Sequence, residues 1–177
     1  MIRRKPRATH FPYTALFRAA REKATVRLGD RDPKTGELTP EAIGRSIEAL
    51  SRCGDLATSL QVDHTVAVAT SATREAPNGR DFLRQVRDKL GLHIDLIAGP
   101  EEARRIYLGV LSGLEFEGRP HAVIDIGGGS TELILGDGHE PRYLSSTKVG
   151  AVRLTAAFVK HDPPTKEEFI EIGRAHV

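Results

Sequence analysis

The segment 122–135, with the sequence AVIDIGGGSTELIL, constrains the fold of this 177-residue chain more than any other part. An apolar strand runs into three consecutive glycines, Gly127 to Gly129, and the chain emerges from them as a second apolar strand. Because glycine has no Cβ, the backbone of this turn can reach positive φ values and bring its N–H groups against an anion. The pattern therefore predicts two strands joined by a turn that holds a phosphate.

Two carboxylates flank these glycines. Asp125 ends the first strand and Glu132 begins the second. They would repel a bare phosphate, but a hard cation such as Mg²⁺ between the carboxylates and the phosphate oxygens removes the conflict. We interpret the pattern as a site for a phosphate and a metal ion. The alternative is a tight glycine hairpin whose acidic residues are only solvated.

Composition excludes several classes of partner. With 26 basic and 24 acidic residues the net charge is +2, so no bulk electrostatic attraction favours nucleic acid or a membrane. No apolar run approaches the roughly 20 residues of a membrane span, and no signal-peptide core follows the basic start. We expect a soluble, cytoplasmic protein that binds neither nucleic acid nor membrane. The single cysteine, Cys53, cannot form an internal disulfide and is expected to be buried.

Both ends of the chain differ from the rest. Residues 1–19 show no clean hydrophobic period, and Phe11–Arg18 within them resembles a translated sequencing adapter, as does the segment 172–177. We expect both ends to be processing scars on a reading frame truncated at each end. The alternative for the first of them is a natural, basic, disordered arm. The part expected to fold is 20–171.

Strands and helices alternate between the ends. Strands are predicted at 25–28, 64–70 and 94–97, in addition to the pair around the glycines and a hairpin turn at Asp137-Gly138. Helices are predicted after the N-cap residues Thr39 and Asn78, over 100–114, from Gly150 to about Val159, and after Pro164. This alternation indicates an α/β layered domain with a mixed sheet.

Two further segments carry residues suited to phosphate chemistry. Arg74 follows small hydroxylated residues at the end of a predicted strand, and its planar guanidinium suits phosphate oxygens, although a surface or capping role is as common. Glu101 and Glu102 occupy the first turn of a predicted helix, where the helix dipole favours the ionised carboxylate that a general base requires. The alternative is that both acids only stabilise the helix.

Four segments, taken together, resemble a known family. Residues 69–78 (ATSATREAPN), 99–104 (GPEEAR), 124–132 (IDIGGGSTE) and 150–155 (GAVRLT) match the exopolyphosphatase and guanosine pentaphosphate phosphatase family in order and spacing, over roughly 22–171. The resemblance implies an α/β fold of the actin-like, ribonuclease-H-like (ASKHA) type. It also implies Mg²⁺ dependence and hydrolysis of a terminal phosphoryl group from polyphosphate or from the pentaphosphate alarmone of the stringent response.

The resemblance also implies roles for individual residues. Glu102 would be the catalytic carboxylate and Arg74 a contact to the reacting phosphate. Asp125 and Glu132 would be the metal-associated acids. The phosphate-binding turn would consist of Gly127, Gly128, Gly129, Ser130 and Thr131.

The chain departs from the family pattern at its start. The family opens with a first phosphate loop, Asp-x-Gly-Ser/Thr-Asn-Ser, and nothing in residues 1–23 resembles it. We therefore expect a domain truncated at the N-terminus, without the second lobe, and a chain that is not a competent enzyme by itself although its parent is one. The sequence does not determine the parent's oligomeric state, for which a homodimer stays open.

Two other functions remain open. Sugar kinases and actin-like ATPases share the fold and an Asp-x-Gly-Gly-Gly loop, but lack the segments around Arg74 and Glu102. A non-catalytic protein could use the same cleft to bind polyphosphate or the alarmone. The choice between polyphosphate and guanosine pentaphosphate is not determined by this sequence.

Overall fold

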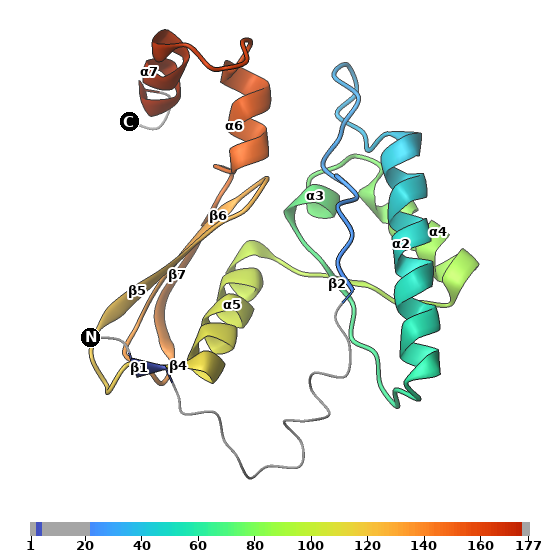
Figure 1. Cartoon of the computed structure of the whole chain (residues 1–177), viewed down its shortest axis with the longest axis horizontal. Helices are drawn as coiled ribbons and strands as arrows, with labels where there is room; N and C mark the ends of the chain where they lie inside the picture. The colour runs from blue at the N-terminus through green and yellow to red at the C-terminus, as the bar shows by residue number, and fades with distance from the viewer. Residues whose placement is uncertain (1–2, 5–21, 175–177) are drawn as a thin grey trace. The chain divides into compact units, whose positions relative to one another are not determined.

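The computed structural model describes residues 3–4 and 22–174, which form two compact units (Figure 1). The first unit is Met1–Ala98 with Ser112–Glu115, and the second is Gly99–Leu111 with Phe116–Val177. Most of the residues predicted to be the first scar lie outside the described ranges, as do the last three residues of the second. Across the described ranges, no helix combines the length and the apolar character that a bilayer crossing requires.

The described residues of the first unit form helices and two short sheets. The helices are α2 (Pro40–Ser59), α3 (Ser71–Arg74) and α4 (Gly79–Leu90). The strands β2 (Val68–Ala69) and β3 (Asp95–Leu96) pair in parallel, and β1 (Arg3–Arg4) pairs antiparallel with β4 (Leu114–Glu115). The core between the helices contains Leu38, Ala76, Phe82 and Val86, which are all buried.

The start of α2 follows the prediction. The Oγ1 atom of Thr39 accepts a hydrogen bond from the N–H of Ala42 at 3.2 Å, and Pro40 occupies the first turn, where its missing N–H costs nothing. The helix buries Ala42, Ser46 and Ala49. The predicted start of this helix is therefore confirmed.

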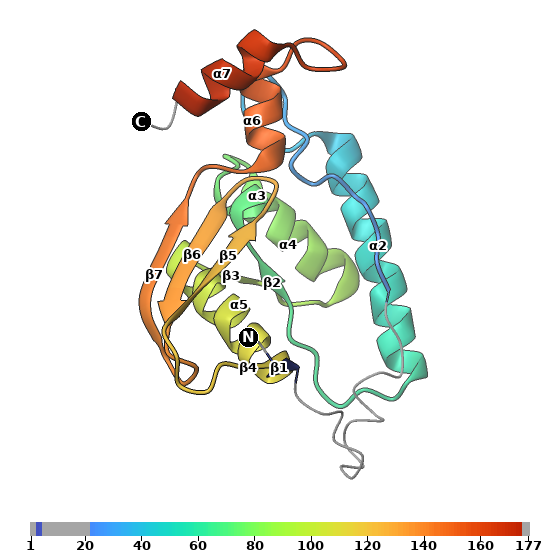
Figure 2. The same ribbon diagram turned by 60° about the vertical axis from the view of Figure 1, so that its left-hand side comes forward.

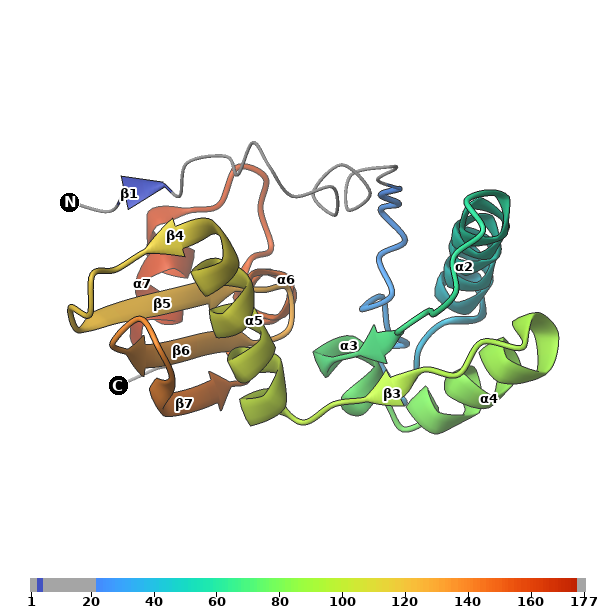
Figure 3. The same ribbon diagram turned by 90° about the horizontal axis from the view of Figure 1, so that it is seen from below.

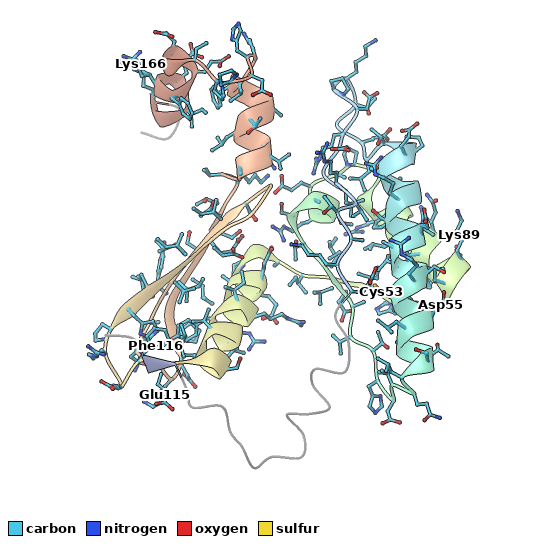
Figure 4. All side chains as sticks on the ribbon, viewed as in Figure 1. Cys53, Asp55, Lys89, Glu115, Phe116 and Lys166 are labelled. Atoms are coloured by element: carbon cyan, nitrogen blue, oxygen red, sulfur yellow. The ribbon has the colours of Figure 1, made fainter. Side chains whose placement is uncertain are left out.

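Three predicted features of the first unit are wrong. No strand forms at 25–28, because Arg27 has a φ of 48° and its carbonyl accepts from the N–H of Asp30 in a turn. Asn78 makes no side-chain cap; its amide instead bonds the N–H and the carbonyl of Leu38, at 2.9 and 3.0 Å. Cys53 is exposed on α2, because the buried strip of that helix ends at Ala49 (Figure 4).

The other two predicted strands of this unit are shorter than expected. The range 64–70 contributes only β2, and 94–97 only β3. Within the described part of the chain each of these strands pairs only with the other, and two-stranded pairings are marginal without further neighbours.

The second unit is an antiparallel meander covered by a helix. Its strands are β5 (His121–Ile126), β6 (Thr131–Gly136) and β7 (Pro141–Thr147), and its helices are α5 (Gly99–Gly113), α6 (Ala151–Phe158) and α7 (Lys166–Arg174). The predicted strands around the glycines and the hairpin turn after Gly136 are confirmed. Parallel and antiparallel pairs are both present, in separate sheets rather than one.

α5 packs on one face of the meander (Figure 3). Ala103 and Tyr107 of the helix and Ile134 of β6 are fully buried together. The hydroxyl of Tyr107 lies 3.1 Å from Nε2 of His121 and accepts from the N–H of Gly138 at 3.0 Å, at the hairpin end of the sheet. Because the helix runs toward that end, its first turn lies at the opposite end, where β5 turns into β6.

Candidate active site

The glycine turn is a short closed loop between β5 and β6. Ile126 and Thr131 form the last pair of the two strands. Beyond that pair, the N–H of Gly127 donates to the carbonyl of Ser130 at 2.9 Å. The turn therefore contains the four residues 127–130.

The β5–β6 turn lies beside the start of α6 (Figure 2). The start of this helix donates hydrogen bonds to the carbonyl groups of the turn. The N–H of Ala151 donates to the carbonyl of Gly127 at 2.9 Å, and the N–H of Arg153 donates to that of Gly128 at 3.1 Å. The Nε atom of Arg153 donates to the carbonyl of Gly129, also at 3.1 Å. Three successive carbonyl groups of the turn thus point toward one helix.

The N–H groups of the turn consequently point the other way. The peptide bonds of the turn are trans, so each N–H is directed opposite to the carbonyl of the preceding residue. The N–H groups of Gly128, Gly129 and Ser130 therefore face away from α6. Within the described residues, none of them donates to a protein atom. Successive N–H groups on one side of a turn form an anion-binding concavity.

Gly127 and Gly128 are needed because other atoms of the protein come close to them, and not because their backbone is left-handed. None of Gly127, Gly128 and Gly129 has a positive φ, so the expected left-handed backbone in this turn is wrong. A Cβ at Gly128 would lie 3.3 Å from Val152, and one at Gly127 would lie 3.0 Å from the carbonyl oxygen of Ser130. Gly150 is more restricted still, because its Cβ would lie 2.5 Å from the carbonyl carbons of Gly128 and Gly129.

Ser130 of the turn and Thr131 at the start of β6 carry the two hydroxyl groups predicted to bind phosphate. Ser130 is 4% exposed. The hydroxyl of Thr131 donates to the carbonyl of Val149, which ties β6 to the segment before α6. Their predicted contact with phosphate stays a prediction.

Asp125 and Glu132 are directly paired across β5 and β6. Paired residues project from the same face with Cβ atoms about 4.5–5.5 Å apart, so both carboxylates lie on the face that α5 covers. Glu132 is only 1% exposed, and its Oε1 accepts from the hydroxyl of Ser146 on β7 at 2.8 Å. Asp125 is exposed.

This carboxylate pair offers the kind of oxygen ligand that magnesium prefers. Mg²⁺ is commonly held by one or two carboxylates, and waters and phosphate oxygens complete its shell. The described residues contain no cluster of three or more metal-ligating side chains, so the protein would supply only part of the shell.

Glu102 and Glu101 have different surroundings in the first turn of α5. Glu101 pairs with Arg104 at 2.7 Å and Arg105 at 2.8 Å, and these hydrogen bonds lower its pKa to about 2. Glu102, which is half-buried like Glu101, directly precedes Ala103, which packs against the sheet. The direction of α5 puts Glu102 at the glycine-turn end of the sheet.

Arg74 belongs to the first unit. It ends α3, and its Nη1 donates to the carbonyl of Ile97 at 2.9 Å. The structure thus assembles Glu102, the carboxylate pair and the glycine turn within the second unit. The role of Arg74 stays a prediction.

Sequence reasoning missed two residues of this site. Ser146 is an ordinary strand residue in the sequence, and only the strand register shows that it bonds Glu132. Arg153 lies in the segment GAVRLT, but the sequence contains no sign that its side chain reaches a carbonyl of the glycine turn.

A further surface hollow lies elsewhere. A cavity of about 550 Å³ at the hairpin end of the sheet is lined by Pro120, His121, Ala122, Leu135, Gly136, Asp137 and Arg142. Its walls are mainly apolar, and Arg142 pairs with Asp137 at 2.8 Å. The hollow therefore does not compete with the glycine turn as a phosphate site.

A family model and the related proteins all point to the same family. The model of the Ppx/GppA phosphatase family matches residues 9–176. Exopolyphosphatase 2 of Mycobacterium tuberculosis is 39% identical over 153 residues, which are 84% of this chain and 48% of that protein. The guanosine-5'-triphosphate,3'-diphosphate pyrophosphatase of Aliivibrio fischeri is 37% identical over 85% of this chain and 30% of its own length.

A solved structure shares the fold. The crystal structure of an exopolyphosphatase from Cytophaga hutchinsonii superposes with a TM-score of 0.80 at 30% identity, over 85% of this chain and 48% of that chain. The fold is therefore of the actin-like type that the sequence predicts. The chain spans about half the length, or less, of these relatives.

Proposed function

Since the chain belongs to the Ppx/GppA phosphatase family, we propose that a protein carrying it hydrolyses the terminal phosphoanhydride bond of inorganic polyphosphate or of guanosine pentaphosphate. The observation that carries this proposal is the set of three N–H groups that face away from α6, beside a pair of carboxylates. Such a site suits a terminal phosphate, which has many acceptor oxygens and no side chain to recognise.

The N–H groups of Gly128, Gly129 and Ser130 bind and orient the terminal phosphate in this proposal. Phosphoryl transfer depends mainly on such positioning and on electrostatic stabilisation. Asp125 and Glu132 would hold Mg²⁺, and the bound ion would neutralise charge on the phosphate oxygens. The bond from Ser146 fixes the buried carboxylate of Glu132 in place.

Glu102 orients the attacking water and takes up its proton. The oxygen of the water bonds to the terminal phosphorus while the bond from phosphorus to the bridging oxygen breaks. The products are orthophosphate and a chain shorter by one phosphate. Arg74 would stabilise negative charge on the transferred group, for which a guanidinium is well suited.

A cytoplasmic location is part of the same proposal. It is supported by the free thiol of Cys53, which suits a reducing compartment. With guanosine pentaphosphate as substrate, the activity would act in the stringent response.

The decisive experiment compares two neighbouring glutamates in the full-length protein. Glu102→Gln keeps the shape of the side chain and removes its charge, so turnover is expected to fall by at least about 10²-fold with little change in KM. Glu101→Gln is the matched control, because Glu101 already pairs with Arg104 and Arg105; its turnover should stay within a few fold of wild type. The measurement is phosphate release from polyphosphate, guanosine pentaphosphate and ATP.

Three outcomes of this experiment would contradict the proposal. Equal turnover of Glu102→Gln and Glu101→Gln would make Glu102 only a helix-start acid. ATP as the preferred substrate would favour the kinase or ATPase class. Binding of polyphosphate without any turnover in the wild-type protein would favour a non-catalytic binding protein.

A further inference from the structure

The segment that follows β7 is hydrogen-bonded to the glycine turn. It supplies three donors to three successive carbonyl groups of the turn, and two of these donors come from one residue, Arg153. Gly150 permits the contact, because any side chain there would overlap the backbone of Gly128 and Gly129.

Two of the three donors are backbone groups, and the third belongs to a side chain. The N–H groups of Ala151 and Arg153 are backbone atoms, which almost any residue supplies. The Nε atom of Arg153 is a side-chain donor, and it is the one that holds the carbonyl of Gly129. The direction of this carbonyl sets the direction of the N–H of Ser130 through the trans peptide bond.

A turn of three glycines needs such a restraint. Glycine has the largest backbone freedom of any residue, so a free Gly127–Gly129 segment would sample many arrangements of its N–H groups. An anion binds best where the donors are already aligned, since aligning them on binding reduces the affinity.

We infer that Arg153 is a positioning residue of the phosphate site, whose guanidinium fixes the glycine turn with its N–H groups aligned for the terminal phosphate. This inference rests on the proposed function, because it takes the turn to be the phosphate-binding element. In this inference Arg153 acts by holding the glycine turn in place, and the attraction of its positive charge for phosphate is not the main effect.

The first test needs no ligand. In the ¹⁵N-labelled 177-residue chain, hydrogen exchange is measured at the amides of positions 151 and 153, which bond the turn. Loss of a charged donor typically weakens a hydrogen-bonded contact by about tenfold or more, so Arg153→Met should speed exchange at position 151 by about tenfold. The amide resonances of Gly128, Gly129 and Ser130 should shift as well.

Arg142→Met is the matched control. Arg142 is also an arginine of the second unit, but it pairs with Asp137 at the hairpin end of the sheet. It should leave exchange at position 151 and the resonances of the turn unchanged. Equal behaviour of the Arg153→Met and Arg142→Met chains would overturn the inference, whatever their phosphate affinity.

The second test is titration with tripolyphosphate in the presence of Mg²⁺, followed at the same resonances. Arg153→Met should weaken binding by about tenfold. Arg153→Lys retains the charge but not the planar guanidinium that carries Nε, and should still bind at least about threefold more weakly than wild type. Wild-type affinity of Arg153→Lys would show that charge alone matters, and would overturn the positioning role.

The two tests separate this inference from the proposed function. If the wild-type chain binds tripolyphosphate at the turn and Arg153→Met binds equally well, only the role of Arg153 fails. If the wild-type chain shows no binding at the turn, the proposed phosphate site fails, and the role of Arg153 in anion binding fails with it.

Discussion

Glu101 and Glu102 show how neighbouring, identical side chains come to lie in different surroundings. Successive residues of a helix project about 100° apart, so the two carboxylates face different surroundings. The arginines at i+3 and i+4 engage Glu101 and lower its pKa to about 2. Glu102 is the direct neighbour of Ala103, which is fully buried at the sheet. The sequence contains both glutamates but does not distinguish them.

At the residue scale, Asp125→Asn should raise the Mg²⁺ concentration required for activity of a protein that carries this chain, without reducing its Tm. Asp125 is exposed, and the described residues include no hydrogen bond or ion pair to its carboxylate, so the substitution removes no structural contact. The measurement is phosphate release as a function of Mg²⁺ concentration, with a parallel thermal melt.

Asp137→Asn is the control for this substitution. Asp137 pairs with Arg142 at the other end of the sheet, and this hydrogen bond lowers its pKa to about 2. The variant should leave the Mg²⁺ dependence unchanged. Unaltered metal dependence and activity in Asp125→Asn would return Asp125 to the solvated-acid interpretation.

At the scale of elements, the contact between the glycine turn and α6 should be sensitive to a single methyl group. Gly150→Ala puts a Cβ against the carbonyl carbons of Gly128 and Gly129, so one backbone must move. Overpacking of this kind typically costs about 1–3 kcal/mol of unfolding free energy. Denaturant unfolding of the chain measures the change.

Gly109→Ala should have the opposite effect on the free energy of unfolding. Gly109 lies within α5, and a Cβ there would meet nothing within 4 Å. Alanine in an unobstructed helical position should stabilise the chain by about 0.5–1 kcal/mol. If Gly150→Ala were as stable as Gly109→Ala, the close approach of α6 to the turn would be wrong.

The start of α7 is stabilised by a buried carboxylate. Glu168 is 7% exposed and accepts from the N–H of Thr165 at 2.8 Å, the N–H of Lys160 at 2.7 Å and Nδ1 of His161 at 2.9 Å. The N–H of Glu168 in turn donates to the hydroxyl of Thr165, which completes a capping box. These bonds, the backbone ones first, lower the pKa of Glu168 from 4.5 to about 2.

The stability of α7 should therefore depend on pH in the acid range. Because the pKa of Glu168 is lower in the folded chain than in the unfolded one, its contribution is fully present above about pH 4.5 and is lost as the pH falls toward 2. Hydrogen exchange in α7 between pH 5 and pH 2 measures this loss. Glu168→Gln should remove much of the pH dependence, whereas Glu167→Gln, on an exposed neighbour, should retain it.

At the scale of the whole molecule, the second face of the β5–β6–β7 sheet is notable for its exposed apolar side chains. Ile124 is 62% exposed, Ile126 71% and Tyr143 52%, and Leu133 and Leu135 lie on the same face. Contiguous apolar surface of this kind commonly marks a contact with another surface.

The 177-residue chain should consequently self-associate as its concentration rises. Burial of apolar surface drives such association at roughly 25 cal/mol per Å². Sedimentation velocity over a concentration series measures it, and the double substitution Ile124→Thr and Ile126→Thr should shift the chain toward monomer while keeping residues that favour strands. A chain that stays monomeric at high concentration would contradict this expectation.

Local patterns in the sequence were sufficient to predict most elements of the fold. The helix after Thr39, the helix over 100–114, the strands around the glycines and the hairpin after Gly136 depend on periodicity, caps and turn residues within a few positions of each other. The range 25–28 also alternates like a strand, but a strand needs a partner, and Arg27 turns the backbone away. Strand pairing is a long-range property that a short pattern cannot contain.

The site shows the same difference between local sequence patterns and long-range contacts. The sequence by itself determined that Asp125, three glycines and Glu132 lie in one strand–turn–strand segment, because these residues are adjacent in the chain. Only the tertiary structure decided that Glu132 is buried and bonded to Ser146, and that Arg153 and the start of α6 turn the glycine carbonyls to one side. Register and packing join residues that are 14 to 24 positions apart, and those contacts fix where each polar group points.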